Sequence, residues 1–330
     1  MSALAPTLQA FFIDRLARQR GASPNTVAAY RDTFRLLLRF ASERTGKQPC
    51  DLDIGDIDAS CVGDFLQHLE AVRLNSVRTR NNRLAAVHSL FRYAALEHPE
   101  HAASIQRVLA IPPKSFARNL VVYLDDEEVS VLIAACDLGS WTGRRDHAML
   151  VLAIQAGPRI SELADLVRGD VTLGRGANVH VVGKGRKERC TPLVPETVAV
   201  LRSWLDERGG DPDDPLFPTT TGRHMSRDAI ERRISLHVGR AATKCPSLLA
   251  KPVTIHTLRH TCAMRLLAAG VEITIIALWL GHEQVSTTYG FYLHADMKLK
   301  ERAVDRVAPL GTKPGRYRAP DSLLAFLESL

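Results

Sequence analysis

Two basic residues occupy local settings that suit the binding of an anion. Arg159 follows Gly157-Pro158 and opens a predicted helix, so its guanidinium adds to the free backbone N–H groups of a helix N-terminus. Lys184 lies between two glycines in a charged turn, from which its ammonium group can reach a ligand. Both settings also suit an ordinary solvated surface residue, so neither residue alone establishes a site.

Two histidines add groups that can bind a phosphate and move a proton. His256 and Arg259 occur in His-Thr-Leu-Arg, a spacing that puts both side chains on one face of a helix. An imidazole beside a fixed cation can bind an anion and exchange a proton near neutral pH. His282 follows Gly281, a glycine that ends the preceding predicted helix and exposes the imidazole. Capping of that helix is the structural alternative for His282.

The order of these motifs along the chain resembles the tyrosine recombinase, or phage integrase, family. A tyrosine follows the last of them, in Thr-Thr-Tyr-Gly-Phe-Tyr-Leu-His. The segment Ser23-Pro24-Asn25-Thr26-Val27-Ala28-Ala29-Tyr30 is similar to the start of the family's core-binding domain. The segment His294-Ala295-Asp296-Met297 resembles the recombinases of transposons and plasmid-borne elements. The resemblance covers nearly the whole chain.

The resemblance implies an enzyme that cuts and rejoins DNA by transesterification. A tyrosine oxygen attacks the scissile phosphate, which leaves a 3′-phosphotyrosine and a free 5′-hydroxyl and conserves the bond energy, so neither ATP nor another cofactor is needed. Arg159 and Arg259 match the two arginines that stabilise the phosphate oxygens, where other phosphoryl-transfer enzymes use a metal ion. Lys184 matches the general acid that protonates the leaving 5′-oxygen.

The remaining matches assign a proton carrier and two supporting groups. His256 corresponds to the general base, and His282 to a further donor to the phosphate. Glu162, in the Gly-Pro-Arg-Ile-Ser-Glu-Leu motif, corresponds to a residue that holds the site together.

The position of the nucleophile departs from the family pattern. Counted from His282, the usual position falls on Phe291, which has no hydroxyl group. Counted back from Leu293-His294-Ala295-Asp296, it falls on Tyr292, which implies one extra residue that Gly290 can accommodate. We therefore expect Tyr292 to be the nucleophile. Tyr289 and a catalytically inactive site remain the alternatives.

A basic helix in the first third of the chain is a candidate DNA contact. Arginines there can pair with phosphates or read base edges in the major groove. The candidates are Arg73, Arg78, Arg80 and Arg83. A solvated basic helix face is the alternative.

The partners that the resemblance implies are double-stranded DNA and further recombinase protomers. Four protomers, of this chain alone or with related recombinases, would assemble on two synapsed sites for integration, excision or transposition of a mobile element in a bacterial cytoplasm. Two other functions remain open: DNA relaxation of the type IB topoisomerase kind, and an inactive or accessory DNA-binding homologue.

Composition agrees with a folded protein of about two domains. The chain has 330 residues, of which 45% are hydrophobic and 24% charged, and its formal net charge is +7, which permits a polyanionic partner. No run of about 18 apolar residues predicts a transmembrane helix, and the first residues lack the features of a signal peptide. The six cysteines are scattered, which favours reduced, mostly buried thiols over a zinc site.

The expected fold is mainly α, with two domains that the resemblance describes as a C-shaped clamp on DNA. Residues 1–111 form the helical core-binding domain, and Pro112-Pro113 opens a linker over 112–122. Residues 123–310 form the catalytic domain, mostly helical with a small β element. Residues 311–330 form a flexible spacer and a short amphipathic helix that docks on a neighbouring protomer. The alternative is that the helix packs back onto its own domain.

Local patterns place the individual elements. The chain carries helix signals that begin at Ser23-Pro24 and near Asp125. A hairpin is predicted from two apolar runs on either side of a glycine-bracketed turn. The predicted strands cover 178–182 and 188–193, and further helices cover 58–71, 76–96, 195–207, 226–239, 255–269 and 271–280.

Overall fold

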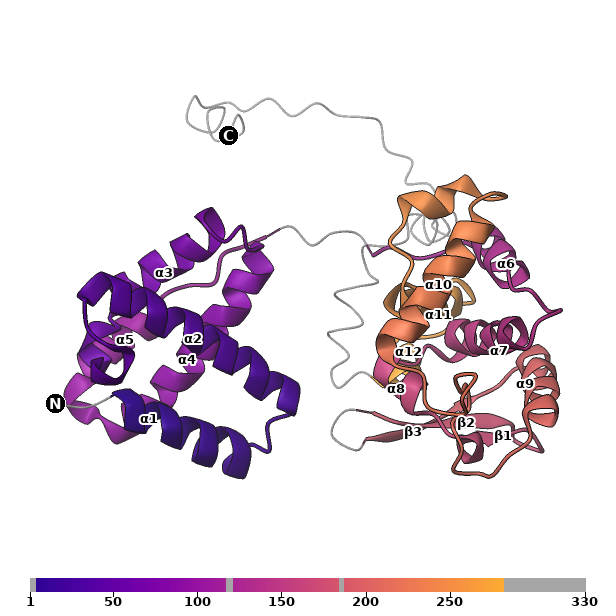
Figure 1. Cartoon of the computed structure of the whole chain (residues 1–330), viewed down its shortest axis with the longest axis horizontal. Helices are drawn as coiled ribbons and strands as arrows, with labels where there is room; N and C mark the ends of the chain where they lie inside the picture. The colour runs from indigo at the N-terminus through magenta and orange to yellow at the C-terminus, as the bar shows by residue number, and fades with distance from the viewer. Residues whose placement is uncertain (1–3, 117–120, 184–186, 282–330) are drawn as a thin grey trace, which may run out of the picture. The chain divides into compact units, whose positions relative to one another are not determined.

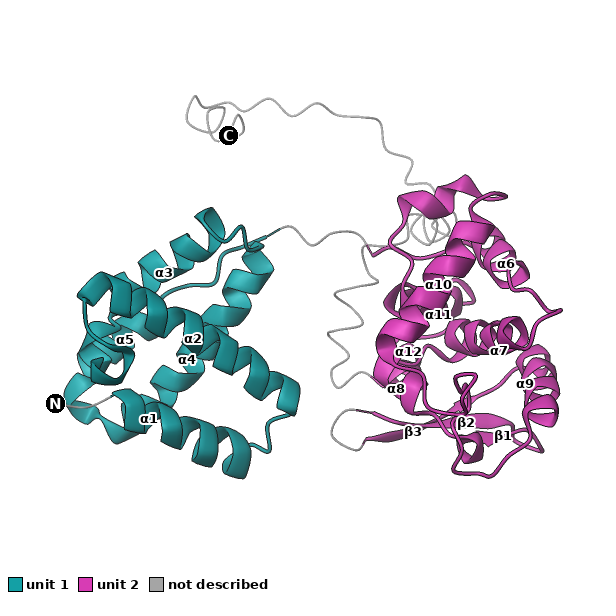
Figure 2. Cartoon of the chain, viewed as in Figure 1, with its two compact units in different colours: residues 1–118 teal, residues 119–330 magenta. Residues whose placement is uncertain are grey.

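The computed structural model describes residues 4–116, 121–183 and 187–281 (Figure 1). The chain divides into two units, residues 1–118 and 119–330 (Figure 2). Helices dominate the described residues of both units, and the strands form one three-stranded sheet. The expectation of a mainly α fold with a small sheet is confirmed. None of the helices in the described ranges is long and apolar enough to span a membrane.

The N-terminal unit is built from helices around an aromatic core. Its elements are α1 (Leu4–Ala10), η1 (a π-helix, Phe11–Gln19), α2 (Pro24–Thr45), α3 (Ala59–Ala71), α4 (Val77–Glu97) and α5 (Ala102–Leu109), with 3₁₀ turns η2 (Pro49–Asp51), η3 (Ile54–Asp56) and η4 (Pro99–His101). Ser23 caps α2 as predicted, because its hydroxyl accepts from the Thr26 N–H at 3.2 Å. Phe11, Phe65 and Phe91 are fully buried.

The start of the predicted linker is bound to α4. The Arg80 guanidinium donates to the Pro112 carbonyl at 3.2 Å. The Asn81 side chain donates to the Lys114 carbonyl at 2.8 Å and accepts from the Lys114 N–H at 3.0 Å. These bonds extend the N-terminal unit past Pro112.

The second unit combines helices with the sheet. Its helices are α6 (Asp126–Ala134), α7 (Trp141–Ala156), α8 (Ile160–Asp165), α9 (Pro195–Arg208), α10 (Arg227–Ala241), α11 (Ile255–Ala268) and α12 (Ile273–Leu280), with 3₁₀ turns η5 (Arg168–Asp170) and η7 (Pro246–Ala250). The helices predicted from α9 onward are confirmed, with small shifts at their ends. The spacer and the amphipathic helix expected over 311–330 lie outside the described residues.

The sheet has the order β1-β2-β3 and is antiparallel throughout. Its strands are β1 (Val171–Thr172), β2 (Asn178–Val182) and β3 (Glu188–Pro192). Val179 pairs with Thr191 and Val182 with Glu188, so the predicted hairpin is confirmed. The Gly183 N–H donates to the Lys187 carbonyl at 2.7 Å and closes the base of its turn.

The core of the second unit surrounds α7. Nearly every residue from Ala148 to Ile154 is buried, and α7 packs against α9 and α11. A helix that is buried on nearly all sides shows no amphipathic period, which explains why no pattern in the sequence predicted α7. The cysteines are all free thiols, and four of the six are buried, as expected.

A buried ionic cluster ties α7 to α10. The Asp146 carboxylate accepts from Arg145 at 2.7 and 3.0 Å, from Arg233 at 2.5 Å, and lies 2.8 Å from His237 Nε2. Burial alone would raise the pKa of Asp146, but these partners lower it. The cluster therefore holds a charged carboxylate inside the unit and fixes two of its helices relative to each other.

Candidate active site

Arg159 stands at the N-terminal end of α8 and is held there by Glu162. Its backbone N–H donates to Glu162 Oε2 at 2.7 Å, and its Nη1 donates to Glu162 Oε1 at 2.6 Å. Its Nη2 donates to the Gly281 carbonyl at 2.8 Å. About 36% of the Arg159 side chain stays exposed, so its guanidinium remains accessible from solvent.

Arg259 lies on α11 and is almost wholly buried. Its Nη1 donates to the Gly157 carbonyl and its Nη2 to the Leu280 carbonyl, both at 2.6 Å. Both carbonyl partners are neutral groups that orient the guanidinium. Arg259 therefore brings a cation to the junction between the ends of α7 and α12.

Two glycines make this junction possible. Gly157 ends α7 with φ +60°, and a Cβ there would lie 2.7 Å from Leu280 Cδ2. Gly281 ends α12 with φ +65°, and a Cβ there would lie 3.1 Å from the Arg189 side chain. Both positions combine a left-handed backbone with a close approach that excludes a side chain.

His256 occupies the first turn of α11, one turn before Arg259 as predicted. Its side chain is exposed on one side, and its ring centroid lies 4.2 Å from that of His260. The protein atoms around the ring, and then the charges of Arg259 and Arg159, lower the pKa of His256 below its usual 6.5. The imidazole is therefore neutral at pH 7 and available as a base.

Arg189, on β3, belongs to the site although no sequence motif singled it out. Its Nη1 donates to Glu162 Oε1 at 3.2 Å and its Nη2 to Glu162 Oε2 at 2.7 Å. Burial alone would raise the pKa of Glu162, but the bonds from Arg189, the Arg159 N–H and the Arg159 side chain lower it to about 2. The one sequence signal for Arg189 is its position in the strand that follows the Gly-Lys-Gly turn, where the alternation of the strand turns its side chain inward.

The structure brings Arg159, Glu162, His256 and Arg259 together where α8, α11 and α12 meet β3 (Figure 1). Other predicted site residues lie outside the described ranges. These are Lys184, His282, Tyr292 and the alternative nucleophile Tyr289. The last described residue before Lys184 is Gly183, and the last before His282 is Gly281, and both border this cluster.

The basic residues of α4 and of the segment just before it, which contains Arg73, do not share one environment. Arg73 and Arg78 are exposed, and the Arg78 guanidinium lies 5.7 Å from the centre of the Phe116 ring. Arg83 is half-buried. Arg80 is only 6% exposed and donates to Pro112 and Asn81, so in this structure its side chain binds the start of the linker.

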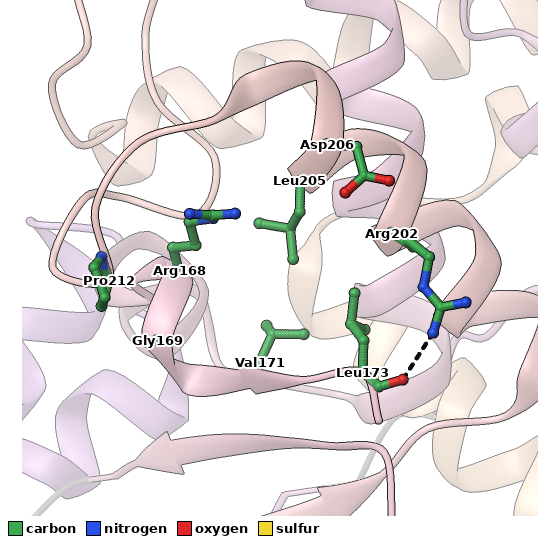
Figure 3. A pocket seen from close by; sticks show the side chains of 8 residues that line it. All are labelled: Arg168, Gly169, Val171, Leu173, Arg202, Leu205, Asp206 and Pro212. Atoms are coloured by element: carbon green, nitrogen blue, oxygen red, sulfur yellow. Dashed lines mark hydrogen bonds between the residues drawn. The ribbon is translucent and has the colours of Figure 1, made fainter. Parts of the chain in front are cut away.

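A depression of about 380 Å³ lies elsewhere in the second unit, between β1 and α9 (Figure 3). Its lining residues are Arg168, Gly169, Val171, Leu173, Arg202, Leu205, Asp206 and Pro212. Arg202 donates to the Leu173 carbonyl at 2.9 Å, and Arg168 donates to the Gly210 carbonyl. None of the site residues above lines this depression.

Comparison with known families and sequences agrees with this site. Residues 122–298 match the phage integrase family, and residues 10–98 match the family's N-terminal SAM-like domain. A Sinorhizobium fredii protein named as an integrase/recombinase is 51% identical over all of this chain and 99% of its own length. The tyrosine recombinase XerD of Pseudomonas putida is 33% identical, over 89% of this chain and 94% of its own.

Solved structures share the fold. The Tn1549 transposon integrase in complex with transposon right end DNA aligns with a TM-score of 0.70 at 18% identity, over 92% of this chain and 99% of its own. The XerH recombinase in a post-cleavage complex aligns with a TM-score of 0.66 at 20% identity, over 86% and 80%. The chain belongs to the phage integrase family and is a tyrosine recombinase.

Proposed function

We propose that the chain cuts and rejoins duplex DNA at a phosphate bound between Arg159 and Arg259. The observation that supports this most strongly is that the two guanidiniums bind the carbonyls of consecutive residues, Gly281 and Leu280. Two cations fixed to one short segment can bind a single phosphate and stabilise the charge that develops on its oxygens.

The proposed reaction breaks one P–O bond and forms another. The Tyr292 oxygen attacks the phosphorus and displaces the 5′-oxygen of the next nucleotide, which gives a 3′-phosphotyrosine. The neutral imidazole of His256 accepts the tyrosine proton, and Lys184 donates a proton to the leaving oxygen. His282 donates a further hydrogen bond to the phosphate. Rejoining reverses these steps with a 5′-hydroxyl of another strand.

DNA contacts outside the active site are proposed for α4 and the segment just before it. Arg73 and Arg78 are exposed and carry no carboxylate partner among the ion pairs of the described residues, so both can bind phosphates. Arg83 stands half-buried beside them, where burial and then the charge of Arg73 lower its pKa. Such contacts would make binding strongly dependent on salt concentration.

Assembly is proposed to use the last residues of the chain. Leu323, Leu324, Leu327 and Leu330 recur at helical spacing after a spacer rich in glycine and proline. A short apolar helix of this kind needs a docking surface. We place that surface on a neighbouring protomer in a four-protomer complex on two DNA sites.

The proposed biological role is the movement of a mobile genetic element in a bacterial cytoplasm. The relative from Sinorhizobium fredii is named as an integrase/recombinase, and a structure of the same fold belongs to a transposon integrase. One observation keeps an accessory, non-cleaving role as the second candidate: Phe291 stands where the family spacing from His282 expects the tyrosine.

The test uses nicked suicide duplexes tiled across the DNA that flanks the coding sequence. A nick lets the cleaved end diffuse away, so the covalent protein–DNA adduct accumulates and appears as a shifted band under denaturing conditions. The reactions contain excess EDTA and no ATP. We expect an adduct on duplexes that carry inverted half-sites, because arginines take the place of a metal in the proposed site.

Two outcomes contradict the proposal. An adduct that forms only when a divalent metal is added would remove the arginines from their proposed role. A protein that binds flanking duplexes tightly but forms no adduct on any of them would support the accessory role instead.

A further inference from the structure

The Glu162 carboxylate is shared by two guanidiniums. It is 3% exposed, and it accepts from Arg159 at 2.6 Å and from Arg189 at 2.7 and 3.2 Å. The Arg189 side chain is itself only 11% exposed, whereas 36% of the Arg159 side chain is open to solvent. Glu162, Arg159 and Arg189 together are called the trio below. Arg189 faces inward, and Arg159 faces the space where a phosphate would bind.

The charges of the trio explain why a second arginine is useful. A carboxylate that holds Arg159 in place also cancels the positive charge that Arg159 offers to a phosphate. Arg189 binds both oxygens of the same carboxylate, so the three side chains together keep one positive charge. Arg159 is then oriented by Glu162 without being neutralised by it.

The same trio borders both segments that lead to predicted catalytic residues. A Cβ on Gly183 would lie 3.1 Å from Glu162 Oε1 and 3.7 Å from Arg159 Nη1. A Cβ on Gly281 would lie 3.1 Å from Arg189 Cδ and Nη1. The trio thus packs directly against the residues that precede Lys184 and His282.

We propose that Arg189 is a positioning residue for DNA strand cleavage, which acts by binding Glu162 so that Arg159 is fixed and the site keeps a net positive charge. This inference rests on the proposed function. The alternative is that Arg189 only stabilises the fold by joining β3 to α8, as a partly buried ion pair can.

The test compares Arg189→Gln, Arg189→Lys, Glu162→Gln and the double variant R189Q/E162Q in the full-length protein. Arg144→Gln is the matched control, because Arg144 also makes a two-point ion pair, with Glu207, at 2.7 Å for each bond and between α7 and α9. Three quantities are measured for each protein: the single-turnover cleavage rate at saturating nicked duplex, the Kd for that duplex, and the melting temperature.

We expect Arg189→Gln to lower the cleavage rate by about 10- to 100-fold, as a misplaced catalytic group does, while the Kd changes by less than about threefold. Arg189→Lys recovers most of the rate, because it restores the charge. In the Glu162→Gln background, Arg189→Gln causes little further loss, because Arg189 acts through that carboxylate. Arg144→Gln cleaves at the wild-type rate.

The inference is overturned if the rate per folded molecule at saturating DNA is unchanged in Arg189→Gln, whatever happens to its melting temperature. Full additivity of the two single variants would also overturn it. If Arg189→Gln does not fold, Arg189→Lys becomes the deciding variant. A cleavage rate for Arg189→Lys that falls only in proportion to its folded fraction supports the charge argument. A loss of cleavage rate as large as that of Glu162→Gln contradicts it. A wild-type protein that forms no adduct would instead contradict the proposed function itself.

Discussion

Arg159 and Arg259 donate to the carbonyl oxygens of neighbouring residues, Gly281 at 2.8 Å and Leu280 at 2.6 Å. The two arginines come from different helices, so the end of α12 aligns them. The same segment leads directly to His282. The C-terminal end of α12 therefore helps to orient both guanidiniums.

Replacement of Arg259 tests its role in charge stabilisation. We expect Arg259→Ala to lower the cleavage rate by about 100-fold or more, because it removes a preorganised cation from the developing phosphate charge. The substitution also leaves the Gly157 and Leu280 carbonyls without this donor, so the melting temperature is recorded for each protein.

Arg259→Lys separates charge from geometry, because it keeps the cation but loses the paired donors. Its cleavage rate should stay well below that of the wild type. Arg202→Ala, at the depression of Figure 3, is the control and should cleave normally. A normal rate for folded Arg259→Ala would exclude this residue from the reaction.

The pH profile of cleavage reports on His256. Its pKa is lowered by its surroundings and by Arg259 and Arg159, so the neutral form that accepts a proton persists below pH 6.5. We expect the rate to be nearly constant from pH 8 to about 6.5 and to fall only at lower pH. His256→Asn should lower the rate and abolish this acid limb. An acid limb centred above pH 6.5 would disagree with the environment of the ring.

Glu162 should contribute to stability in a defined pH window. Its folded pKa is about 2, below its model-compound value of 4.5, so its contribution is complete above pH 4.5 and is lost as the pH falls toward 2. Between pH 5 and pH 3, that loss is about 2 kcal/mol. Urea unfolding of the wild type and Glu162→Gln at several pH values measures it. The stability difference between the two proteins should shrink as the pH falls, and a constant difference would contradict the shift.

Deletion of residues 319–330 tests the proposed docking segment. The truncated protein should bind a single DNA site with nearly unchanged affinity, because the deletion removes none of the proposed DNA-contacting residues. It should form the four-protomer complex on two sites less well, because the leucine stripe is gone. Gel-shift and light-scattering measurements report the two steps separately. Normal recombination of two sites by the truncated protein would leave the segment without a role in assembly.

The sequence predicted elements whose signals are local. Ser23 caps α2, and the hairpin of β2 and β3 pairs in the register that its alternating residues favour. The helix α7 escaped prediction because it is buried on nearly all sides and therefore lacks an amphipathic period. Burial on all sides results from the tertiary fold, and a short stretch of sequence does not reveal it.

The sequence also predicted part of the candidate site. The motifs identified Arg159, His256 and Arg259, and the structure gathers them through carbonyls and charges that are distant in sequence. No motif predicted Arg189, because its importance depends on an ion pair with Glu162, which lies on a different element. A basic helix pattern also cannot show which arginine turns inward, as Arg80 does to bind the linker.

The central claim is that Tyr292 attacks the DNA. Two tyrosines and one phenylalanine compete for this position. One residue turns a helix by about 100°, so Tyr292 cannot take the place of Phe291 on an unchanged helix. Gly290 allows the backbone adjustment that one extra residue requires. The downstream segment from Leu293 to Asp296 then selects Tyr292 over Tyr289.

The most direct measurement traps the covalent adduct on a nicked duplex, digests it, and locates the phosphotyrosine by mass spectrometry. We expect a modified peptide that carries the nucleotide on Tyr292. We also expect that Tyr292→Phe forms no adduct but binds DNA normally, because the substitution removes a single oxygen. An adduct on Tyr289, or one that persists in Tyr292→Phe, would contradict the account.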